Sequence, residues 1–237
     1  MQNYKFSSIE EVIEDKQGLL LIDKEVDWTS HDVVAKIRGI TGVRRVGHAG
    51  TLDPLATGLL IILVSREFTK LQDQFMKQDK EYEVEAKFGI TTDSYDSMGD
   101  IVDEMSWEEI KDLSEEKIKI SMKDFLGQIE QTVPAYSAVK VNGKKLYEKA
   151  RKGNVDLEKL PSRVVRIYDF DLLEFNKDLI TKVITAKFKT KVSSGTYIRS
   201  LIHDLGQRLQ VGAHVVSLRR TKIGDISVDL ATKLPLS

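Results

Sequence analysis

Apolar residues in the first third of the chain fall into short runs and one helical repeat. The run at residues 19–22 predicts a short buried strand over residues 18–24. Thr29 and Asp32 then form a weakened capping box, and apolar residues recur at helical spacing until Gly42. A second apolar run, at residues 59–64, has the length of a core strand. The pattern therefore predicts a strand, a helix and a second buried strand, in that order.

Two later segments alternate between apolar and polar residues. Residues 81–90 place Tyr82 and four further apolar side chains on one face and charged side chains on the other, which predicts a strand with Tyr82 on its buried side. Residues 181–192 alternate in the same way. Residues 198–209 then trace a single apolar helical face, with Arg199 in the first turn of the predicted helix.

The segment between these strands is polar and acidic. Residues 91–100 are expected to form a loop, and Ser106 with Glu109 forms a full capping box that opens an acidic helical region reaching about residue 125. Strands and helices therefore mix without strict alternation, which favours an α+β fold over a doubly wound sheet. No repeat or linker divides the 237 residues, so we expect a single domain over residues 1–237.

Composition narrows the class of protein. The chain is 41% hydrophobic and 31% charged and contains no cysteine, so disulfides, thiolate metal sites and a cysteine nucleophile are excluded. Its first 16 residues are acidic, unlike the basic start of a secretory signal, and its longest apolar run is far shorter than the roughly 20 residues that a membrane helix needs. A cytoplasmic protein without membrane association is expected.

A net charge of −1 gives no global sign of a nucleic-acid partner, but the charge is unevenly distributed. Residues 140–152 contain six basic residues and one acid, a local charge of +5. Most such runs are solvated surface, although in an RNA-binding protein this one would suit phosphate contacts. The basic residues are Lys140, Lys144, Lys145, Lys149, Arg151 and Lys152.

Residues 47–58 form a loop in which three glycines and one proline precede the apolar strand. A rigid loop that abuts a core strand is a common place for a functional site. By itself, the Asp53-Pro dipeptide would more often be a structural turn. Asp93, Asp96 and Asp100 invite a calcium interpretation, but the alternating ligands and closing glutamate of a calcium loop are missing. No metal is expected.

Four segments together resemble a known family. Residues 47–60, GHAGTLDPLATGLL, resemble the signature loop of the TruB family of tRNA pseudouridine synthases. Similar motifs follow in the same order, at Lys80-Glu-Tyr82, at Tyr136-Ser-Ala-Val-Lys140 with Gly143 and Leu146, and at Gly195-Thr-Tyr-Ile-Arg199. The resemblance extends from about Gly18 to Gly224.

The resemblance implies both a fold and a reaction. The fold would be a central mixed, mainly antiparallel sheet flanked by helices and loops, with a cleft floored by the Asp53 loop. The reaction would isomerise uridine 55 in the T loop of tRNA by flipping the base out, detaching it from the ribose and rejoining it through carbon. Neither a cofactor nor an obligate protein partner is implied.

The same resemblance assigns roles to individual residues. Asp53 would be the catalytic carboxylate, Arg199 its cationic partner, and Tyr82 the ring that stacks on the flipped base, although whether Asp53 acts as nucleophile or base stays open. His48 would fill the space that the base leaves, and Leu218 would line the uracil pocket. The other residues expected to contact RNA are Gly50, Thr51, Leu52, Lys80, Tyr197, Lys140, Lys144 and Lys145.

The chain departs from the family pattern in two places. Many relatives carry a further RNA-binding module, called PUA, and none is expected here because about a dozen residues follow the motif at Arg219. The segment before Tyr136 reads Val133-Pro134, where the family usually has paired prolines. Residues 131–155 are still expected to form the RNA-gripping segment.

Other functions remain open at this point. They are a non-catalytic tRNA-binding or folding factor and a pseudouridine synthase for another RNA, such as one guided by small nucleolar RNA. An enzyme for free nucleotides is disfavoured because the sequence lacks a phosphate-cradling glycine loop followed by Lys and Ser or Thr.

Overall fold

The chain falls into two compact units, which are described separately here. A computed structural model describes residues 4–137, 139–141, 143–150 and 160–234. Unit 1 comprises residues 1–83 and 218–237, and unit 2 comprises residues 84–217. Strands β4 (Lys80–Phe88) and β12 (Ala213–Ile223) each contain residues of both units. No helix within the described ranges is long and apolar enough to cross a membrane.

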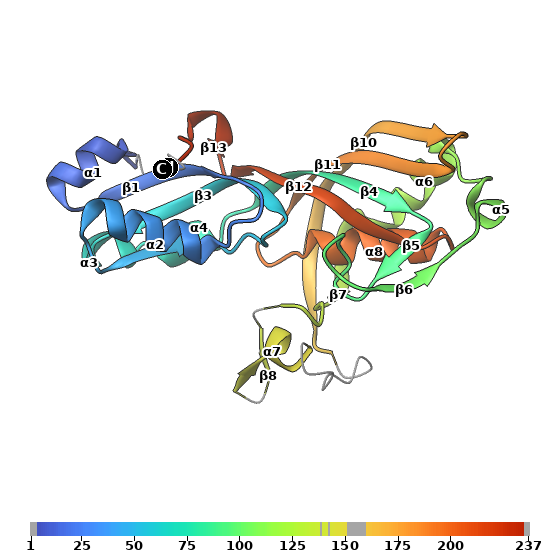
Figure 1. Cartoon of the computed structure of the whole chain (residues 1–237), viewed down its shortest axis with the longest axis horizontal. Coiled ribbons are helices and arrows are strands. Elements are labelled where there is room, and N and C mark those ends of the chain that lie inside the picture. Colours follow the sequence, from blue (N-terminus) through green and yellow to red (C-terminus); the bar gives the residue numbers. More distant parts are fainter. Residues whose placement is uncertain (1–3, 138, 142, 151–159, 235–237) are drawn as a thin grey trace. The chain divides into compact units, whose positions relative to one another are not determined.

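Unit 1 is built around strand β3 (Figure 1). Its remaining elements are β1 (Gly18–Lys24), β2 (Val46–Ala49), β13 (Ile226–Ser227), α1 (Ile9–Asp15), α2 (Ser30–Thr41), α3 (Arg66–Thr69), α4 (Gln72–Met76) and the 3-10 turn η3 (Val228–Leu230), with β3 itself at Ala56–Val64. Strands β1 and β2 pair antiparallel with β3, whereas β12 pairs parallel with it. The expected mixed, mainly antiparallel sheet is therefore confirmed in this unit.

The pairing registers place β2 and β12 on the same edge of β3. Strand β1 pairs with residues 58–64 of β3 along one edge. On the other edge, β2 ends with Ala49 opposite Ile61, and β12 places Arg220 opposite Gly58. Strand β2 therefore covers the later part of this edge of β3, and β12 covers its beginning. The loop of residues 50–55 leaves the edge between the two strands, so residues of β12 lie close to it.

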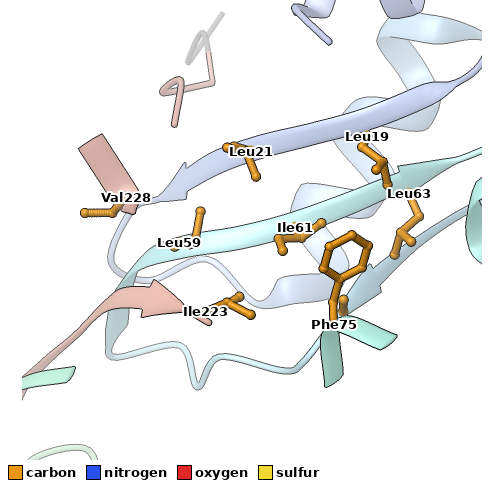
Figure 2. Close-up of a cluster of buried hydrophobic side chains, with 9 residues drawn as sticks. Leu19, Leu21, Leu59, Ile61, Leu63, Phe75, Ile223 and Val228 are labelled. Carbon is orange, nitrogen blue, oxygen red and sulfur yellow. The ribbon is translucent and has the colours of Figure 1, made fainter. Parts of the chain in front are cut away.

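The core of unit 1 lies on one face of these strands (Figure 2). Leu19 and Leu21 of β1 pack with alternate residues of β3, and Phe75 of α4 closes the cluster. Ile223 and Val228 add the C-terminal segment to the same core. The predicted strands at residues 18–24 and 59–64 are thus confirmed, with β3 beginning earlier, at Ala56.

Helix α2 matches its prediction and has a stronger cap than expected. The Thr29 side chain accepts from the Asp32 amide, and the Asp32 carboxylate accepts from the Thr29 amide, so the capping box is complete. The helix ends at Gly42, whose φ of 70° is the left-handed conformation that glycine adopts without strain. Local sequence therefore fixes both ends of α2, immediately before the candidate loop.

Unit 2 is an antiparallel sheet with helices packed on it (Figure 1). Besides part of β4 and β12, its elements are β5 (Ile90–Thr92), β6 (Ile101–Glu104), α5 (Trp107–Ile110), α6 (Glu115–Met122), the 3-10 turn η1 (Lys123–Phe125), β7 (Gly127–Thr132), β8 (Lys140–Val141), β9 (Lys144–Lys145), α7 (Leu146–Ala150), β10 (Ser162–Asp178), β11 (Val183–Val192) and α8 (Ile198–Arg208). Strand β10 pairs antiparallel with β11 and β7. The predicted strand at residues 181–192 and helix at residues 198–209 are confirmed.

Two sequence predictions in unit 2 were incomplete. The acidic region at residues 106–125 forms two short helices and a 3-10 turn instead of one helix. The expected loop at residues 91–100 begins with strand β5. Strand β10 was not predicted, because two irregularities in its pairing with β11 shift the phase of its apolar residues and disrupt the two-residue period.

Candidate active site

Asp53 lies in the loop of unit 1 that connects β2 to β3. Its carbonyl accepts from the Ala56 amide at 3.0 Å, which closes a tight turn through Pro54. Leu52 is buried, whereas Thr51 is exposed and Asp53 is partly buried. The loop therefore anchors an apolar side chain in the core immediately before the carboxylate and leaves the carboxylate accessible.

Arg220 of β12 contacts this loop from the sheet edge. Its side chain is 1% exposed. Its Nε donates to the Leu59 carbonyl at 2.8 Å, and its terminal nitrogens donate to the carbonyls of Gly50 at 3.2 Å and Thr51 at 3.5 Å. The guanidinium thus joins the two ends of the loop. No feature of the local sequence had singled out this residue.

Ser30 and Lys24 fix the residues on either side of Asp53. The Ser30 hydroxyl, at the start of α2, accepts from the Leu52 amide at 2.8 Å and donates to the Leu52 carbonyl at 3.1 Å. The Lys24 ammonium donates to the Pro54 carbonyl at 3.3 Å and also to the carbonyls of Glu25 and Trp28. These donors act on the main chain, so the loop conformation depends on residues distant in sequence.

Buried cations surround the loop. Burial lowers the pKa of Lys24 to about 8, with a further lowering by Arg220, while the charges of Asp53 and Asp27 act in the opposite direction. Asp53 is therefore close enough to Lys24 for its carboxylate to stabilise the charge of the lysine. An ionised carboxylate is the form that can act as a nucleophile or a base.

His48 lies on β2, five residues before Asp53. Burial, and secondarily the charge of Arg220, lowers the pKa of this histidine, so its ring is neutral at pH 7. Its Nδ1 is buried and has no hydrogen-bond partner in the described residues. A neutral ring held beside the loop is suited to occupying apolar space.

Tyr82 and Lys80 lie on β4, and Leu218 on β12. Tyr82 is 8% exposed, which confirms the predicted buried side of the strand. The Lys80 ammonium donates to the carbonyls of Phe75, Met76 and Gln78 at the end of α4. Its contacts within the chain are therefore with the backbone of its own unit. Leu218 is buried and pairs with Ala56 at the start of β3.

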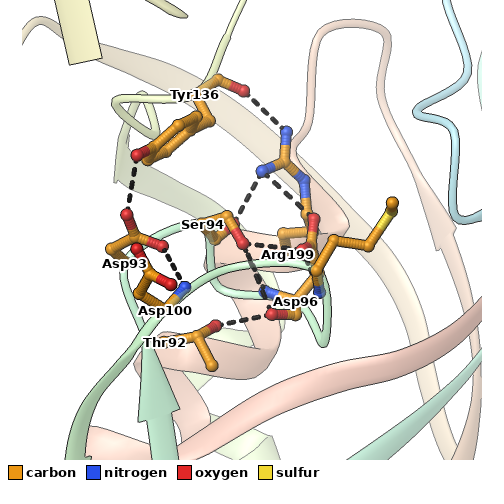
Figure 3. Close-up of polar contacts among 8 residues, drawn as sticks. Thr92, Asp93, Ser94, Asp96, Asp100, Tyr136 and Arg199 are labelled. Atoms are coloured by element: carbon orange, nitrogen blue, oxygen red, sulfur yellow. Dashed lines mark hydrogen bonds and ion pairs between the residues drawn. The ribbon is translucent and has the colours of Figure 1, made fainter. Parts of the chain in front are cut away.

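Arg199 lies in unit 2, at the start of α8 (Figure 3). It is 4% exposed, and its two terminal nitrogens donate to the carbonyls of Ser94 at 2.7 Å and Tyr136 at 2.9 Å. Its Nη1 lies 3.6 Å from the Asp96 carboxylate. A cation near a helix N-terminus opposes the helix dipole, and this buried carboxylate offsets that effect.

Two of the three aspartates that invited a calcium interpretation have hydrogen-bond partners for their carboxylates (Figure 3). The Asp96 carboxylate accepts from the Ser94 hydroxyl at 2.6 Å and from the Met98 amide at 3.0 Å. The Asp93 carboxylate accepts from the Tyr136 hydroxyl at 2.7 Å and from the Asp100 amide at 3.0 Å. The acidic loop thus holds Arg199 and Tyr136 in place.

The remaining predicted RNA contacts are in unit 2. Tyr197 precedes α8, and its amide and carbonyl both bond to the Gln131 side chain, at 2.8 and 3.0 Å. Lys140 belongs to β8, and Lys144 and Lys145 belong to β9, but their side chains lie outside the described part of the structure. Arg151 and Lys152 lie entirely outside the described residues, as does part of the predicted gripping segment at residues 131–155.

Unit 1 thus collects the candidate residues His48, Gly50, Thr51, Leu52, Asp53, Lys80, Tyr82 and Leu218, and unit 2 carries Tyr136, Tyr197 and Arg199. Sequence reasoning missed Arg220, Ser30 and Lys24 around the loop, and it considered Asp96 only for a calcium site and not as the partner of Arg199. All four residues are polar, and all except Ser30 are charged, yet the fold buries them. A polar residue among apolar neighbours was the only feature of the sequence that could have indicated them.

Comparisons with known proteins give a consistent result. The model of the TruB family pseudouridylate synthase (N terminal domain) matches residues 38–198, and that of the tRNA pseudouridylate synthase B C-terminal domain matches residues 199–235. Proteins named tRNA pseudouridine synthase B are 41% identical in Opitutus terrae and 42% identical in Chlamydia abortus. The alignments cover 92% and 90% of this chain, and 88% and 86% of those relatives.

Solved structures agree with the sequence relatives. A chain in a structure titled "Crystal Structure of a Cbf5-Nop10-Gar1 Complex" is 29% identical, with a TM-score of 0.66 over 99% of this chain. Another, titled "Structure of H/ACA RNP bound to a substrate RNA containing 2'-deoxyuridine", is 27% identical, with a TM-score of 0.65. This chain spans 58% and 56% of those two chains.

Proposed function

Because this chain belongs to the TruB family of pseudouridine synthases, and is therefore an RNA-modifying isomerase, we propose that it converts uridine 55 in the T stem-loop of tRNA to pseudouridine. The observation that carries the proposal is the loop from Gly47 to Gly58. It keeps Asp53 accessible, fixes the main chain on both sides of it and surrounds it with buried cations. That arrangement suits a reactive carboxylate.

The proposed reaction breaks the bond between C1′ of the ribose and N1 of uracil, rotates the base and joins C1′ to C5. The C5 proton is then lost, and N1 gains a proton. Asp53 acts as nucleophile or base in this sequence. Tyr82 offers the aromatic ring on which a flipped base stacks, and Leu218 lines the uracil pocket. Arg199 is the cationic partner of the carboxylate.

RNA must be held while its base is flipped. His48 is proposed to fill the space that the base leaves, because its ring is neutral and lies on the strand that leads into the loop. Gly50, Thr51, Leu52, Lys80, Tyr197 and the basic residues Lys140, Lys144 and Lys145 are the other proposed contacts. Phosphate contacts of this kind give binding that weakens with salt.

A second basic cluster supports RNA binding by unit 1. Arg44, Arg45, Arg66 and Lys70 are exposed, and none forms an ion pair with another described residue. Arg45 donates through Nε to the Thr69 hydroxyl at 3.1 Å, which ties the start of β2 to α3. His48 is three residues from Arg45, or about 10 Å along an extended strand. Phosphates next to the flipped nucleotide are within this range.

Tritium release from a tRNA transcript labelled at C5 of uridine tests the proposal. Purified wild-type chain, assayed alone and with EDTA present, should release tritium, whereas Asp53→Asn should release none and still bind the transcript within a few fold. A transcript with cytidine at position 55 is the matched substrate control. Activity of the chain alone would support a tRNA enzyme that needs neither metal nor protein partner.

Binding without release by the wild-type chain would contradict the proposal and favour a tRNA-binding or folding factor. Release from the cytidine-55 transcript at the full rate would move the target to another uridine. Equal loss of binding and turnover in Asp53→Asn would contradict the catalytic role of the carboxylate.

A further inference from the structure

Arg220 occupies a position where a charged side chain is unusual. It is one of the largest fully buried side chains of the described residues, and its neighbour Arg219 instead lies at the surface in a bidentate pair with Asp23. Within the described part of the chain, Arg220 forms no ion pair. Burial of a charge without an opposite charge is unfavourable, so a specific set of acceptors must compensate for it.

Those acceptors are main-chain carbonyls on both sides of Asp53. The carbonyls of Gly50 and Thr51 precede the aspartate and that of Leu59 follows it, and all three accept from the one planar guanidinium. The planar guanidinium presents its donors at fixed angles and at different positions, whereas a lysine ammonium is a single point donor with another reach and would not reproduce this set of contacts. The fork of Arg220 therefore sets the distance between the two ends of the loop.

The backbone of Arg220 is equally constrained. Gly58 lies opposite Arg220 in the parallel pairing, and a Cβ atom on this glycine would lie 2.3 Å from the Arg220 carbonyl oxygen. The glycine φ of 98° also excludes most other residues. This close approach brings the arginine near enough for its side chain to reach back under the loop.

Ser30, at the start of α2, adds a further contact to the same loop. Its hydroxyl bonds to both the amide and the carbonyl of Leu52, the residue immediately before Asp53. Arg220 and Ser30 together hold the main chain at residues 50, 51, 52 and 59, and so set the backbone from which the Asp53 side chain projects.

We propose that Arg220, assisted by Ser30, is a positioning residue that holds the Asp53 carboxylate in its reactive geometry. This inference rests on the proposed function, since it assigns Asp53 the central role. Arg220 also places a positive charge near the loop, as its lowering effects on the pKa values of Lys24 and His48 indicate.

The test separates loop geometry from RNA binding and from folding. Arg220→Lys keeps the charge but loses the fork, and Ser30→Ala removes only the hydroxyl. Arg219→Gln is the matched control, because it removes a guanidinium at the neighbouring position of the same strand. For each variant, the single-turnover rate constant of tritium release is measured with enzyme in excess, together with the dissociation constant for tRNA and the midpoint of thermal unfolding.

We expect the rate constant to fall by about 100-fold in Arg220→Lys and about 10-fold in Ser30→Ala, because displacements near 1 Å have effects of this size. The dissociation constant should stay within about threefold in both, and Arg219→Gln should react at the wild-type rate. This split between rate and binding would not follow from a merely structural role.

Three results would overturn the inference. The first is a folded Arg220→Lys that reacts within twofold of wild type, and the second is a parallel loss of binding and rate, which would make Arg220 an RNA contact. If Arg220→Lys does not fold, the third such result is a Ser30→Ala variant that reacts at the wild-type rate. Absence of release by the wild-type chain itself would instead refute the proposed function, so the two failures are distinguishable.

Discussion

The Asp53 loop of unit 1 and the Arg199 cluster of unit 2 fix a functional charge in opposite ways. The Asp53 loop is held through its main chain, by donors from Arg220, Ser30 and Lys24. Arg199 is itself the donor, and it is held by two carbonyls and the Asp96 carboxylate. The Asp53 loop is thus fixed through its backbone, whereas the guanidinium of Arg199 is fixed through its own side chain, with a charge partner in its own unit.

The difference shows how each unit tolerates buried charge. In unit 1 the buried cations Arg220, Lys24 and Lys80 rely on carbonyl dipoles, and burial lowers the pKa of both lysines to about 8. In unit 2 a cation and an anion are buried together. Removing one group should therefore be most destabilising in unit 2, where it leaves a single charge without its partner.

The largest expected effect is that of Asp96→Ala. It removes the carboxylate beside buried Arg199 and the two hydrogen bonds that this carboxylate accepts from Ser94 and Met98, so the free energy of unfolding should fall by about 3–5 kcal/mol. Asp124→Ala, which breaks the exposed pair with Arg208, is the control and should change it by no more than about 1 kcal/mol. Urea unfolding followed by circular dichroism measures both. Equal effects would contradict the contrast between the two units.

Gly58→Ala should destabilise unit 1 by about 2 kcal/mol or more, because the new methyl group meets the Arg220 backbone at a positive φ. Gly39→Ala is the matched control. Gly39 lies inside α2 with no atom near the added methyl, so the same change should stabilise the chain by about 0.5–1 kcal/mol. Thermal unfolding of both variants tests the prediction, and a neutral Gly58→Ala would show that the sheet edge can widen.

The double variant Arg45→Gln with Arg66→Gln tests the exposed cations of unit 1. Loss of two phosphate contacts should weaken tRNA binding by about tenfold at moderate salt and reduce the slope of log K against log salt by about 1.5. Lys119→Gln in α6 with Lys123→Gln in η1 changes the net charge equally and should leave the slope unchanged. Filter binding at several salt concentrations measures this. Identical slopes for both double variants would make the effect one of net charge alone.

The smallest effect concerns two neighbours in α8, the helix that carries Arg199. Burial raises the pKa of Asp204 to about 6 and lowers that of His203 to about 4. Below pH 6, folded Asp204 binds more protons than the unfolded chain, so its contribution to stability grows as pH falls towards 4. Folded His203 binds fewer protons than His203 in the unfolded chain, so its contribution to stability is lost as the pH falls from 6.5 to 4. The two contributions oppose each other.

Single substitutions should separate these contributions. Asp204→Asn should make the loss of stability between pH 6.5 and 4 steeper, and His203→Gln should make it shallower. Unfolding free energies measured at pH 6.5, 5 and 4 check both signs. His203 stacks on Tyr95, with ring centroids 3.8 Å apart, so Tyr95→Phe serves as a control that keeps the stacking and the burial. Unchanged pH dependence in both variants would show that α8 is better solvated than its burial indicates.

Local sequence predicted those elements whose pattern is periodic. The capping box at Thr29, the apolar run of β3 and the alternation of β4 each contain their own signal, and the structure confirms all three. Strand β12 was not predicted because it buries His214 and Arg220 among its apolar residues, which obscures a two-residue period. From the sequence alone, a buried polar residue is predicted to lie at the surface, because the partners that allow its burial are not known.

The sequence by itself determined the family, the loop that contains Asp53 and the residues of the aligned motifs, because these depend on continuous stretches of a few residues. The tertiary structure alone decided what holds them. Arg220 is 170 positions from Gly50, and Arg199 is 105 positions from Ser94. Contacts over such separations leave no periodic trace in the sequence, because they depend on which strand edges and loops the fold brings together.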